Sequence, residues 1–342
     1  MRVLFTDSQY HSQRQYEKPV WIFPAHLASY ATYLRDEGNE VVWLGNDDGK
    51  FDKVIDSDLQ IPVDFEKLPY PDRVFTNAKN PKYLSYGNYK FFPGTHFLSS
   101  NLCWWAGAKG CIFCVDSKRV MDGEKRGFRS VDHVMTEIED CIRLEFAEMF
   151  DDAGTIPIGD WLEKLCVSMI KTGFNKRIVL GCNLKPIAEK VVPFKLMKAA
   201  GFRFILVGVE SANQETIDKI RKGQDSEKVI ENMKAMNDAG LEVHLTSMFG
   251  YEWETHEDAM RTVKLVHHLL KKGYVKTAQA SVFSPPRTKP DPNSPGHRYI
   301  PMIYDAYRSP EFWLHKIKDI RKWEDITYML RGGRLVLEEK VR

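Results

Sequence analysis

Two segments, Arg203-Phe-Ile-Leu-Val-Gly-Val209 and Leu241-Glu-Val-His-Leu-Thr-Ser-Met248, decide the expected fold. The first is a short, mainly apolar run, and the second has apolar residues at Leu241, Val243 and Leu245, a pattern that favours a β-strand. Between them lie two stretches with helical signals, 213–221 and 225–239, the second with Asp225 as its expected N-cap. Strands that alternate with helices along a chain predict parallel pairing within one sheet.

The same alternation extends to both sides of this core. Further strands and helices are expected over 95–100, 144–150, 176–182 and 276–283 for the strands and over 130–142, 158–172, 187–200 and 255–272 for the helices. Six strand–helix units predict an α/β fold whose centre is a partial (β/α)6 TIM-like barrel, open on one side. In barrels of this kind the chemistry lies at the C-terminal ends of the strands.

The N-terminal residues predict a separate small layer. Residues 1–6 and 40–45 are expected strands, and residues 24–37 carry a helical stripe of apolar side chains between them. Together they form one β-α-β unit of a Rossmann-like layer. Residues 46–95 are rich in Asp, Pro, Asn and Lys, and we expect them to form a wrapping linker.

The pattern changes again after residue 284, where a proline-rich loop begins. Beyond it we expect helices near 298–306 and 309–331 and a short strand-like end at 334–338. The expected organisation is a truncated Rossmann-like layer with its linker over 1–75, the barrel over 76–290, and a C-terminal helical extension over 291–342.

Composition and charge exclude several classes of function. The 342 residues carry a formal net charge of +2, so no basic field argues for a nucleic-acid partner. The chain has no apolar run of membrane-spanning length, and residues 1–7 lack the long apolar core of a secretion signal. Six cysteines, three of them clustered, do not suggest a disulfide framework, and they fit a reducing cytoplasmic location.

The clustered cysteines lie in the segment Cys103-Trp-Trp-Ala-Gly-Ala-Lys-Gly-Cys111-Ile-Phe-Cys114, which follows the first expected barrel strand. Three thiolates can hold a [4Fe–4S] cube by three irons and leave the fourth open for chemistry on a bound molecule. Zinc is the alternative, but a structural zinc site needs a fourth ligand, and the nearest downstream donors are His133 and Cys141. A third interpretation, that all three are core residues, is opposed by Gly107 and Gly110, which indicate a loop.

Several segments resemble the radical S-adenosylmethionine (radical SAM) enzymes, and within them most closely the group that has a cobalamin-binding N-terminal domain. The resemblance rests on the order and spacing of 68–72, 99–114, 148–152, 207–211, 220–223 and 246–255. Each of these motifs is weak when taken alone, whereas their arrangement over the chain is specific.

The resemblance implies an enzyme that binds S-adenosylmethionine (SAM) at the open iron of a [4Fe–4S] cluster. Reductive cleavage of SAM would give a 5′-deoxyadenosyl radical for methylation, cyclisation or another C–H functionalisation. The implied partners are a small-molecule or peptide substrate and a reductant such as flavodoxin or ferredoxin, with no membrane and no nucleic acid. The cofactor carries the difficult chemistry, and the protein positions and shields it.

By the same resemblance, Cys103, Cys111 and Cys114 are the iron ligands. The common motif of the family has three residues between its first two cysteines, and this chain has seven. A longer loop still reaches the cube, and the Cys-x2-Cys end is intact.

The resemblance also implies contacts to SAM, and each has a structural alternative. The implied residues are Phe113 near the adenine, Asp151 or Asp152 at the methionine ammonium, and Glu210, Ser211 and Arg221 after the fourth barrel strand. Phe113 serves equally as a core aromatic, the aspartates as helix caps, and an arginine on a helix is most often solvated. A carboxylate such as Glu210, directly after an apolar run, is costly to bury unless it is paired.

The N-terminal layer departs from the cobalamin-binding relatives. Their cobalt-ligating histidine belongs to an Asp-x-His-x-x-Gly motif, whereas this chain has Asp7-Ser-Gln-Tyr-His11. We therefore expect no cobalamin ligated through a histidine. Cobalamin held at the barrel mouth without a protein ligand remains an open alternative.

Two alternative functions are an RNA-modifying enzyme and a non-enzymatic binding module. An RNA-modifying, methylthiotransferase-like enzyme would need the cysteines of a second cluster, but Cys141 and Cys166 lie on expected helices as core residues. Cys182 ends a strand and is expected to be a buried thiol, and His244 fits a core or a site position equally. The non-enzymatic alternative is a metal-stabilised binding module, which metal analysis separates from the enzyme.

Overall fold

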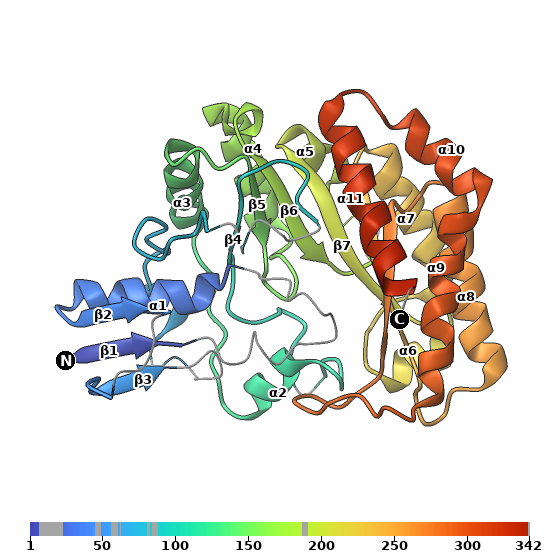
Figure 1. Ribbon diagram of the computed structural model, residues 1–342, viewed down its shortest axis with the longest axis horizontal. Coiled ribbons are helices and arrows are strands. Elements are labelled where there is room, and N and C mark those ends of the chain that lie inside the picture. Colours follow the sequence, from blue (N-terminus) through green and yellow to red (C-terminus); the bar gives the residue numbers. More distant parts are fainter. Residues whose placement is uncertain are drawn as a thin grey trace.

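The computed structural model describes residues 1–6, 23–44, 49–55, 61, 63–80, 83, 88–107, 109–186 and 191–340, with side chains up to residue 331. Within these residues the chain forms two parallel sheets, a small one near the N-terminus and a larger one in the centre (Figure 1). No helix in these ranges is both long enough and apolar enough to cross a bilayer.

The larger sheet has six parallel strands in the order β4-β5-β6-β7-β8-β9. The strands are β4 (Gly94–Phe97), β5 (Glu148–Asp151), β6 (Val179–Leu184), β7 (Phe202–Glu210), β8 (Glu242–Phe249) and β9 (Thr277–Val282). Strand order equals chain order, and β4 and β9 pair on one side only, so the barrel is partial and open. This confirms the predicted α/β fold.

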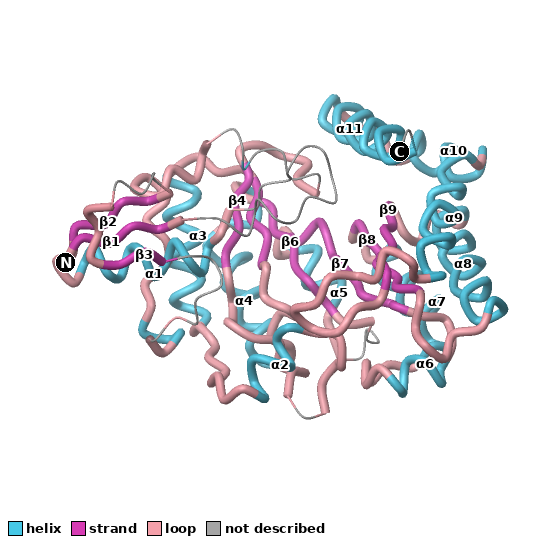
Figure 2. Tube along the Cα trace, turned by 60° about the horizontal axis from the view of Figure 1, so that its bottom comes forward, coloured by secondary structure: helices cyan, strands magenta, loops and turns pink. Residues whose placement is uncertain are grey.

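Helices follow the strands and cover the outer face of this sheet (Figure 2). Those on the outer face are α3 (Val131–Arg143), α4 (Asp160–Thr172), α5 (Phe194–Ala199), α7 (Val229–Asp238) and α8 (His256–Lys271). Two shorter helices, α2 (Val115–Met121) and α6 (Gln214–Lys219), lie at the lower edge of Figure 1. The main apolar core lies between this face and the helices and includes Ile205 and Val207 of β7. Alternation along β7 turns Phe204 to the inner face, where it packs with Tyr89 and Phe150.

Helix boundaries follow local signals that the sequence carries. The Ser130 side chain accepts a hydrogen bond from the His133 N–H and caps α3. Gly173 ends α4 in the left-handed conformation. The expected helix at 187–200 is shorter, because α5 begins at Phe194 and residues 187–190 lie outside the described residues.

The small sheet has the order β2-β1-β3, with β1 (Arg2–Phe5), β2 (Glu40–Trp43) and β3 (Lys53–Ile55), and α1 (Ala25–Asp36) packs on it. Strand β3 corrects the expectation that 46–95 is only a wrapping linker. Its three residues are too few to show an alternating pattern, and pairing with β1 decides their conformation.

A buried ion network joins this layer to the barrel. Arg73 and Arg129 both donate to the carboxylate of Glu137 in α3, at 2.6 and 2.9 Å. Arg129 also donates to the Ser29 hydroxyl of α1 and to the Pro69 carbonyl, both at 3.1 Å. One carboxylate therefore fixes the linker and the small layer against the barrel.

The C-terminal segment forms α9 (Ile300–Asp305), α10 (Pro310–Lys318) and α11 (Trp323–Lys340). The single helix expected over 309–331 is divided, because the Asp325 carboxylate accepts from the N–H groups of Arg321 and Lys322 and starts a new helix. The strand-like end expected at 334–338 is wrong, since α11 continues through it. A helix satisfies its own backbone hydrogen bonds, whereas a lone strand needs a neighbour.

Candidate functional site

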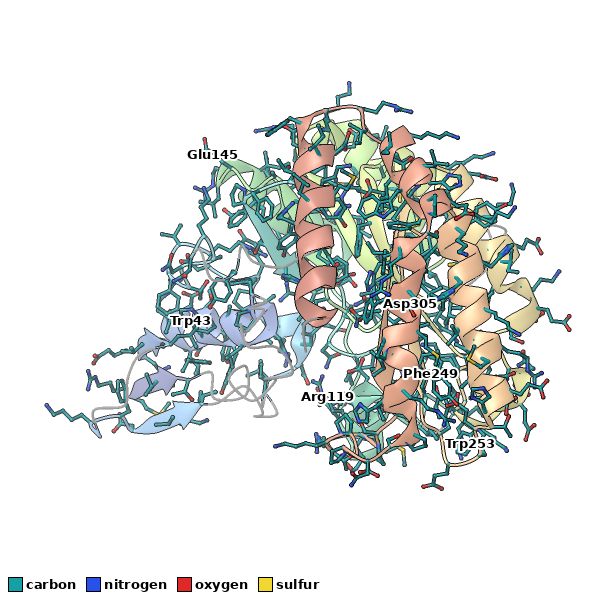
Figure 3. All side chains as sticks on the ribbon, turned by 45° about the vertical axis from the view of Figure 1, so that its right-hand side comes forward. Trp43, Arg119, Glu145, Phe249, Trp253 and Asp305 are labelled. Carbon is teal, nitrogen blue, oxygen red and sulfur yellow. The ribbon has the colours of Figure 1, made fainter. Side chains whose placement is uncertain are left out.

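The candidate site lies where the six strands of the larger sheet end. The loop with the three cysteines follows β4 and leads into α2, and α2 and α6 both lie at the lower edge of Figure 1. Figure 3 shows Arg119 of α2 and Trp253, which follows β8, at this end, and Glu145, which precedes β5, at the other. We call the end with α2 the mouth of the barrel.

Hydrogen bonds hold the cysteine loop in place. The Cys103 N–H donates to the Asp116 carboxylate at 2.7 Å, and the Trp105 N–H donates to the Cys103 sulfur at 3.4 Å. Cys114 is the residue directly before α2. Backbone N–H groups of the first turn of α2 donate to its sulfur, as they do to an anion at a helix start.

The three thiols lie on one loop at the mouth, and thiolates are the usual protein ligands of iron–sulfur clusters. Each of Cys111 and Cys114 lies within electrostatic range of another cysteine of the set. Burial raises the pKa of Cys114 to about 11, so that coordination to iron must displace its proton. Among the described residues, no three His, Cys, Asp or Glu side chains gather around one point as a single metal ion would need.

Asp151 and Asp152 are adjacent but occupy different environments. Asp151 is buried and accepts from the Ser99 hydroxyl and N–H at 2.5 and 3.0 Å, so its carboxylate anchors the start of the cysteine loop. Asp152 is exposed to the inside of the half-barrel. Enclosure by the surrounding walls, with the Asp151 and Asp116 carboxylates nearby, raises the pKa of Asp152 to about 7.

Glu210 ends β7 and is paired with a residue that the sequence analysis did not single out. Its carboxylate accepts from the Lys222 ammonium at 2.7 Å, and both groups are largely buried. Glu210 has a φ of 64°, a strained value for a non-glycine residue, at a point where the pairing register of β7 and β8 shifts. A Cβ at Gly208 would lie 2.3 Å from the Glu210 Oε1, so the pair requires glycine there.

Of the other predicted SAM contacts, Phe113 lies beside this ion pair, since the Lys222 ammonium is 5.6 Å from the centre of its ring, whereas the Ser211 and Arg221 side chains are directed elsewhere. Ser211 is fully buried, and its hydroxyl accepts from the Asn213 N–H at 3.1 Å. The Arg221 side chain is exposed, and its carbonyl accepts from the Trp105 indole at 2.9 Å. Phe113 packs beside the apolar cluster of Ile217 and Tyr251 at the mouth.

Two lysines and a tryptophan at the mouth were missed in the sequence analysis. Lys185 directly follows β6, and its ammonium lies 3.4 Å from the centre of the Trp105 ring. Burial lowers the pKa of Lys185 to about 8. Negative charge at Cys111 and Cys103 would raise this pKa, but its effect is smaller than that of burial. The sequence did carry a signal for Lys185. The criterion that selected Glu210, a charged residue at the end of an apolar strand, applies equally to Lys185.

The remaining cysteines lie away from the loop. Cys141, Cys166 and Cys182 are fully buried in the main core, as expected for structural thiols. His244 faces the inner side of β8, where its Nδ1 lies 2.8 Å from the Thr277 hydroxyl and its ring packs against Phe204.

Residues 101–266 match the family model described as the Radical SAM superfamily. The chain carries a radical SAM domain. This match covers the cysteine loop and the ends of β5 to β8, and it confirms the predicted family and the prediction of an enzyme. Radical SAM enzymes use a [4Fe–4S] cluster and SAM, and they need a reductant and a substrate.

One curated relative is the uncharacterized methyltransferase PH0819 of Pyrococcus horikoshii, which is 25% identical over 179 residues, or 51% of this chain and 37% of the relative. The chain therefore spans little more than a third of the length of that relative.

Two solved structures are also similar to this radical SAM chain. The methyltransferase TsrM of Kitasatospora setae, with tryptophan and a SAM analogue bound, shares 17% identity and a TM-score of 0.47, over 59% of this chain and 37% of TsrM. The cobalamin-dependent enzyme OxsB, with aqua-cobalamin and SAM bound, shares 14% identity and a TM-score of 0.48, over 74% and 34%. Likeness at this level says nothing of activity or substrate.

Proposed function

We propose that this protein cleaves SAM reductively to generate a 5′-deoxyadenosyl radical, which then functionalises a C–H bond of its substrate by methylation, cyclisation or a related reaction. The observation that carries this proposal is the position of Cys103, Cys111 and Cys114 at the mouth, beside the Glu210–Lys222 pair and Asp152. The C-terminal ends of parallel strands are the face where barrel enzymes carry out chemistry.

In this proposal Cys103, Cys111 and Cys114 bind the cluster. When the cluster is bound, it supplies the electron for SAM cleavage. Glu210 and Asp152 present carboxylates for the cationic groups of SAM, the ammonium and the sulfonium. Lys222 holds the Glu210 carboxylate in place, and Asp151 supports the cysteine loop through Ser99. The walls of the half-barrel keep water from the reacting groups.

We propose a small molecule or peptide as substrate and a flavodoxin- or ferredoxin-like protein as reductant. The inner face of the half-barrel offers Asn183, Thr246 and Gln279 as hydrogen-bonding groups, in keeping with a polar substrate. Among the reaction outcomes, methyl transfer is the one that the name of the curated relative supports.

For the N-terminal layer we propose a packing role without histidine ligation of cobalt. Its own apolar core includes Val3, Phe5, Leu27 and Leu68, and the buried Glu137 network holds it to the barrel. Asp7 and His11 lie outside the described residues. Hydroxocobalamin added to wild type and to His11→Ala should give the same spectra. A spectral change that is lost in the variant would contradict this role.

The proposed function is tested by anaerobic incubation with SAM and a reductant, followed by mass spectrometry. Release of 5′-deoxyadenosine is expected, and additional S-adenosylhomocysteine would indicate methyl transfer. Replacing Cys103, Cys111 and Cys114 together with alanine should abolish both products and the iron content. Cys166→Ala, which removes a buried thiol far from the loop, is the matched control and should retain the cluster. Undiminished 5′-deoxyadenosine release from the triple variant would reject the proposal.

A further inference from the structure

Trp105, in the lengthened segment between Cys103 and Cys111, is docked at the mouth. The Trp105 indole N–H donates to the Arg221 carbonyl at 2.9 Å, which ties the cysteine loop to the loop after α6. A Cβ at Gly223 would lie 2.1 Å from the Trp105 ring, and Gly223 has a φ of 62°, so the docked indole requires glycine there for two reasons.

Lys185 lies against the docked indole. Its ammonium is 3.4 Å from the centre of the Trp105 ring, 5.4 Å from that of Trp104, and 3.3 Å from the Gly223 carbonyl oxygen. The residue is only 6% exposed. All of these contacts are with neutral groups.

A buried ammonium ordinarily has a counter-charge, because desolvating an unpaired charge is costly. Lys222, the neighbouring lysine at the mouth, has one in Glu210 at 2.7 Å. Within the part of the chain that the structure describes, no carboxylate forms an ion pair with Lys185.

The indole against which Lys185 lies belongs to Trp105, whose backbone N–H donates to the Cys103 sulfur at 3.4 Å. Once deprotonated, the sulfurs of Cys111 and Cys103 would favour the charged form of Lys185, whereas the Lys222 ammonium opposes it.

We propose that Lys185, held in place by the Trp105 indole, is a counter-charge of the cysteine-bound [4Fe–4S] cluster and raises its reduction potential. Lys185 is thus a positioning residue that acts on SAM cleavage through the cluster. The proposal rests on the proposed function for the presence of the cluster itself.

The physical reason is electrostatic. One-electron reduction by the reductant adds one negative charge to a [4Fe–4S] cluster, and a fixed cation nearby stabilises the reduced form more than the oxidised form. Net charge, hydrogen bonds to the sulfurs and solvent exposure are the terms by which proteins set such potentials. Lys185 supplies the charge, and the loop between Cys103 and Cys111 supplies the other two, through the Trp105 N–H bond to the Cys103 sulfur and the cover of two indoles.

The test is a redox titration of the full chain, anaerobically reconstituted, with the reduced cluster followed by electron paramagnetic resonance and with iron and sulfide counted. Lys185→Met should have a more negative potential than wild type at unchanged iron and sulfide content. Lys185→Arg retains the charge and should stay close to wild type. Lys219→Met is the matched control, because Lys219 lies over the Trp253 ring at 5.2 Å and pairs with Glu215.

A wild-type potential in fully loaded Lys185→Met would overturn the inference and leave the proposed function intact. Absence of a cluster in the wild-type protein would instead reject the proposed function. If Lys185→Met does not load, Lys185→Gln is measured in its place. Should both neutral variants fold without a cluster while Lys185→Arg loads, the charge is required for cluster binding itself, which supports the counter-charge. Failure of Lys185→Arg as well would assign Lys185 a packing role and overturn the proposal.

Discussion

The two ends of the same barrel strands treat buried charge differently. At the end where the strands begin, Glu148 of β5, Arg203 of β7 and Glu242 of β8 form one ion network. Arg203 donates to Glu148 at 2.5 Å and to Glu242 at 2.7 Å. Lys90 bonds both Glu242 and Asp325, at 3.1 and 2.5 Å, which brings α11 into the network.

At the mouth, by contrast, the buried Glu210–Lys222 pair lies beside two charges, Asp152 and Lys185, that form no ion pair within the described residues. Asp152 forms no ion pair there, Lys185 contacts neutral groups, and Glu210 is held in a strained conformation beside Lys222. Glycine at positions 208 and 223 leaves room for these arrangements.

The direction of the pKa shift separates charges that stabilise the fold from charges that are available to bind a ligand. A carboxylate that the fold ionises easily contributes to stability, whereas one whose ionisation the fold resists is available to a ligand. Arg203 and Lys90 lower the pKa of Glu242 to about 2 in spite of its burial, while enclosure raises the pKa of Asp152 to about 7.

The largest effect is expected from Arg203→Met. It leaves Glu148 and Glu242 without their shared cation, and breaking a buried ion pair costs about 3–5 kcal/mol of the free energy of unfolding. Urea denaturation measures this loss. Lys276→Met, which removes the half-exposed pair with Asp319, is the control and should cost less than about 1 kcal/mol. Equal losses in the two variants would show that the buried network contributes no more to stability than a half-exposed ion pair does.

A second effect, measured on binding, is expected from Glu210→Gln, which also lowers stability because it leaves the buried Lys222 ammonium without its partner. Loss of a hydrogen bond to a charged acceptor costs about 1.5–3 kcal/mol, so the affinity for SAM should fall about 10- to 100-fold. Anaerobic calorimetric titration measures the affinity. Glu215→Gln on the exposed face of α6 should leave it unchanged. A Glu210→Gln variant with wild-type affinity would show that the mouth carboxylate is structural.

The smallest effect is expected from Asp152→Asn, which should increase the free energy of unfolding, whereas Arg203→Met should decrease it. The folded-state pKa of Asp152 is raised to about 7 from 3.8, so its ionisation weakens the folded state increasingly as the pH rises from about 4 to 7. The variant should therefore be more stable than wild type at pH 8, by less than about 1 kcal/mol because the side chain is exposed to the half-barrel. Thermal unfolding at pH 5 and pH 8 measures the difference.

The pH dependence of SAM binding provides the functional half of the same test. Wild-type affinity should rise between pH 6 and 8 as Asp152 ionises, and the rise should be absent in Asp152→Asn. Glu242 acts in the reverse sense, because its contribution to stability is present above pH 4.5 and is lost as the pH falls towards 2. Destabilisation by Asp152→Asn at pH 8 would contradict the proposed contrast.

Much of the barrel followed from local sequence, and the exceptions have local causes. The strands ending at Glu210 and Phe249 were expected because their apolar residues are bounded by helical segments on both sides. Strand β3 was not expected, because three residues show no period and depend on pairing with β1. The helix over 334–338 was missed because the local β-propensity of Leu335-Val-Leu337 conflicts with the longer helix around it.

By itself, the sequence determined the order of the elements, the parallel pairing and the presence of Cys103, Cys111 and Cys114 at the mouth, since parallel strands bring the residues that follow them to one edge. Only the tertiary structure decided which charges meet: Glu210 with Lys222, Asp151 with Ser99, and Lys185 with Trp105. Periodicity is a property of neighbouring residues, whereas an ion pair depends on where side chains from different loops end within a few ångströms of one another.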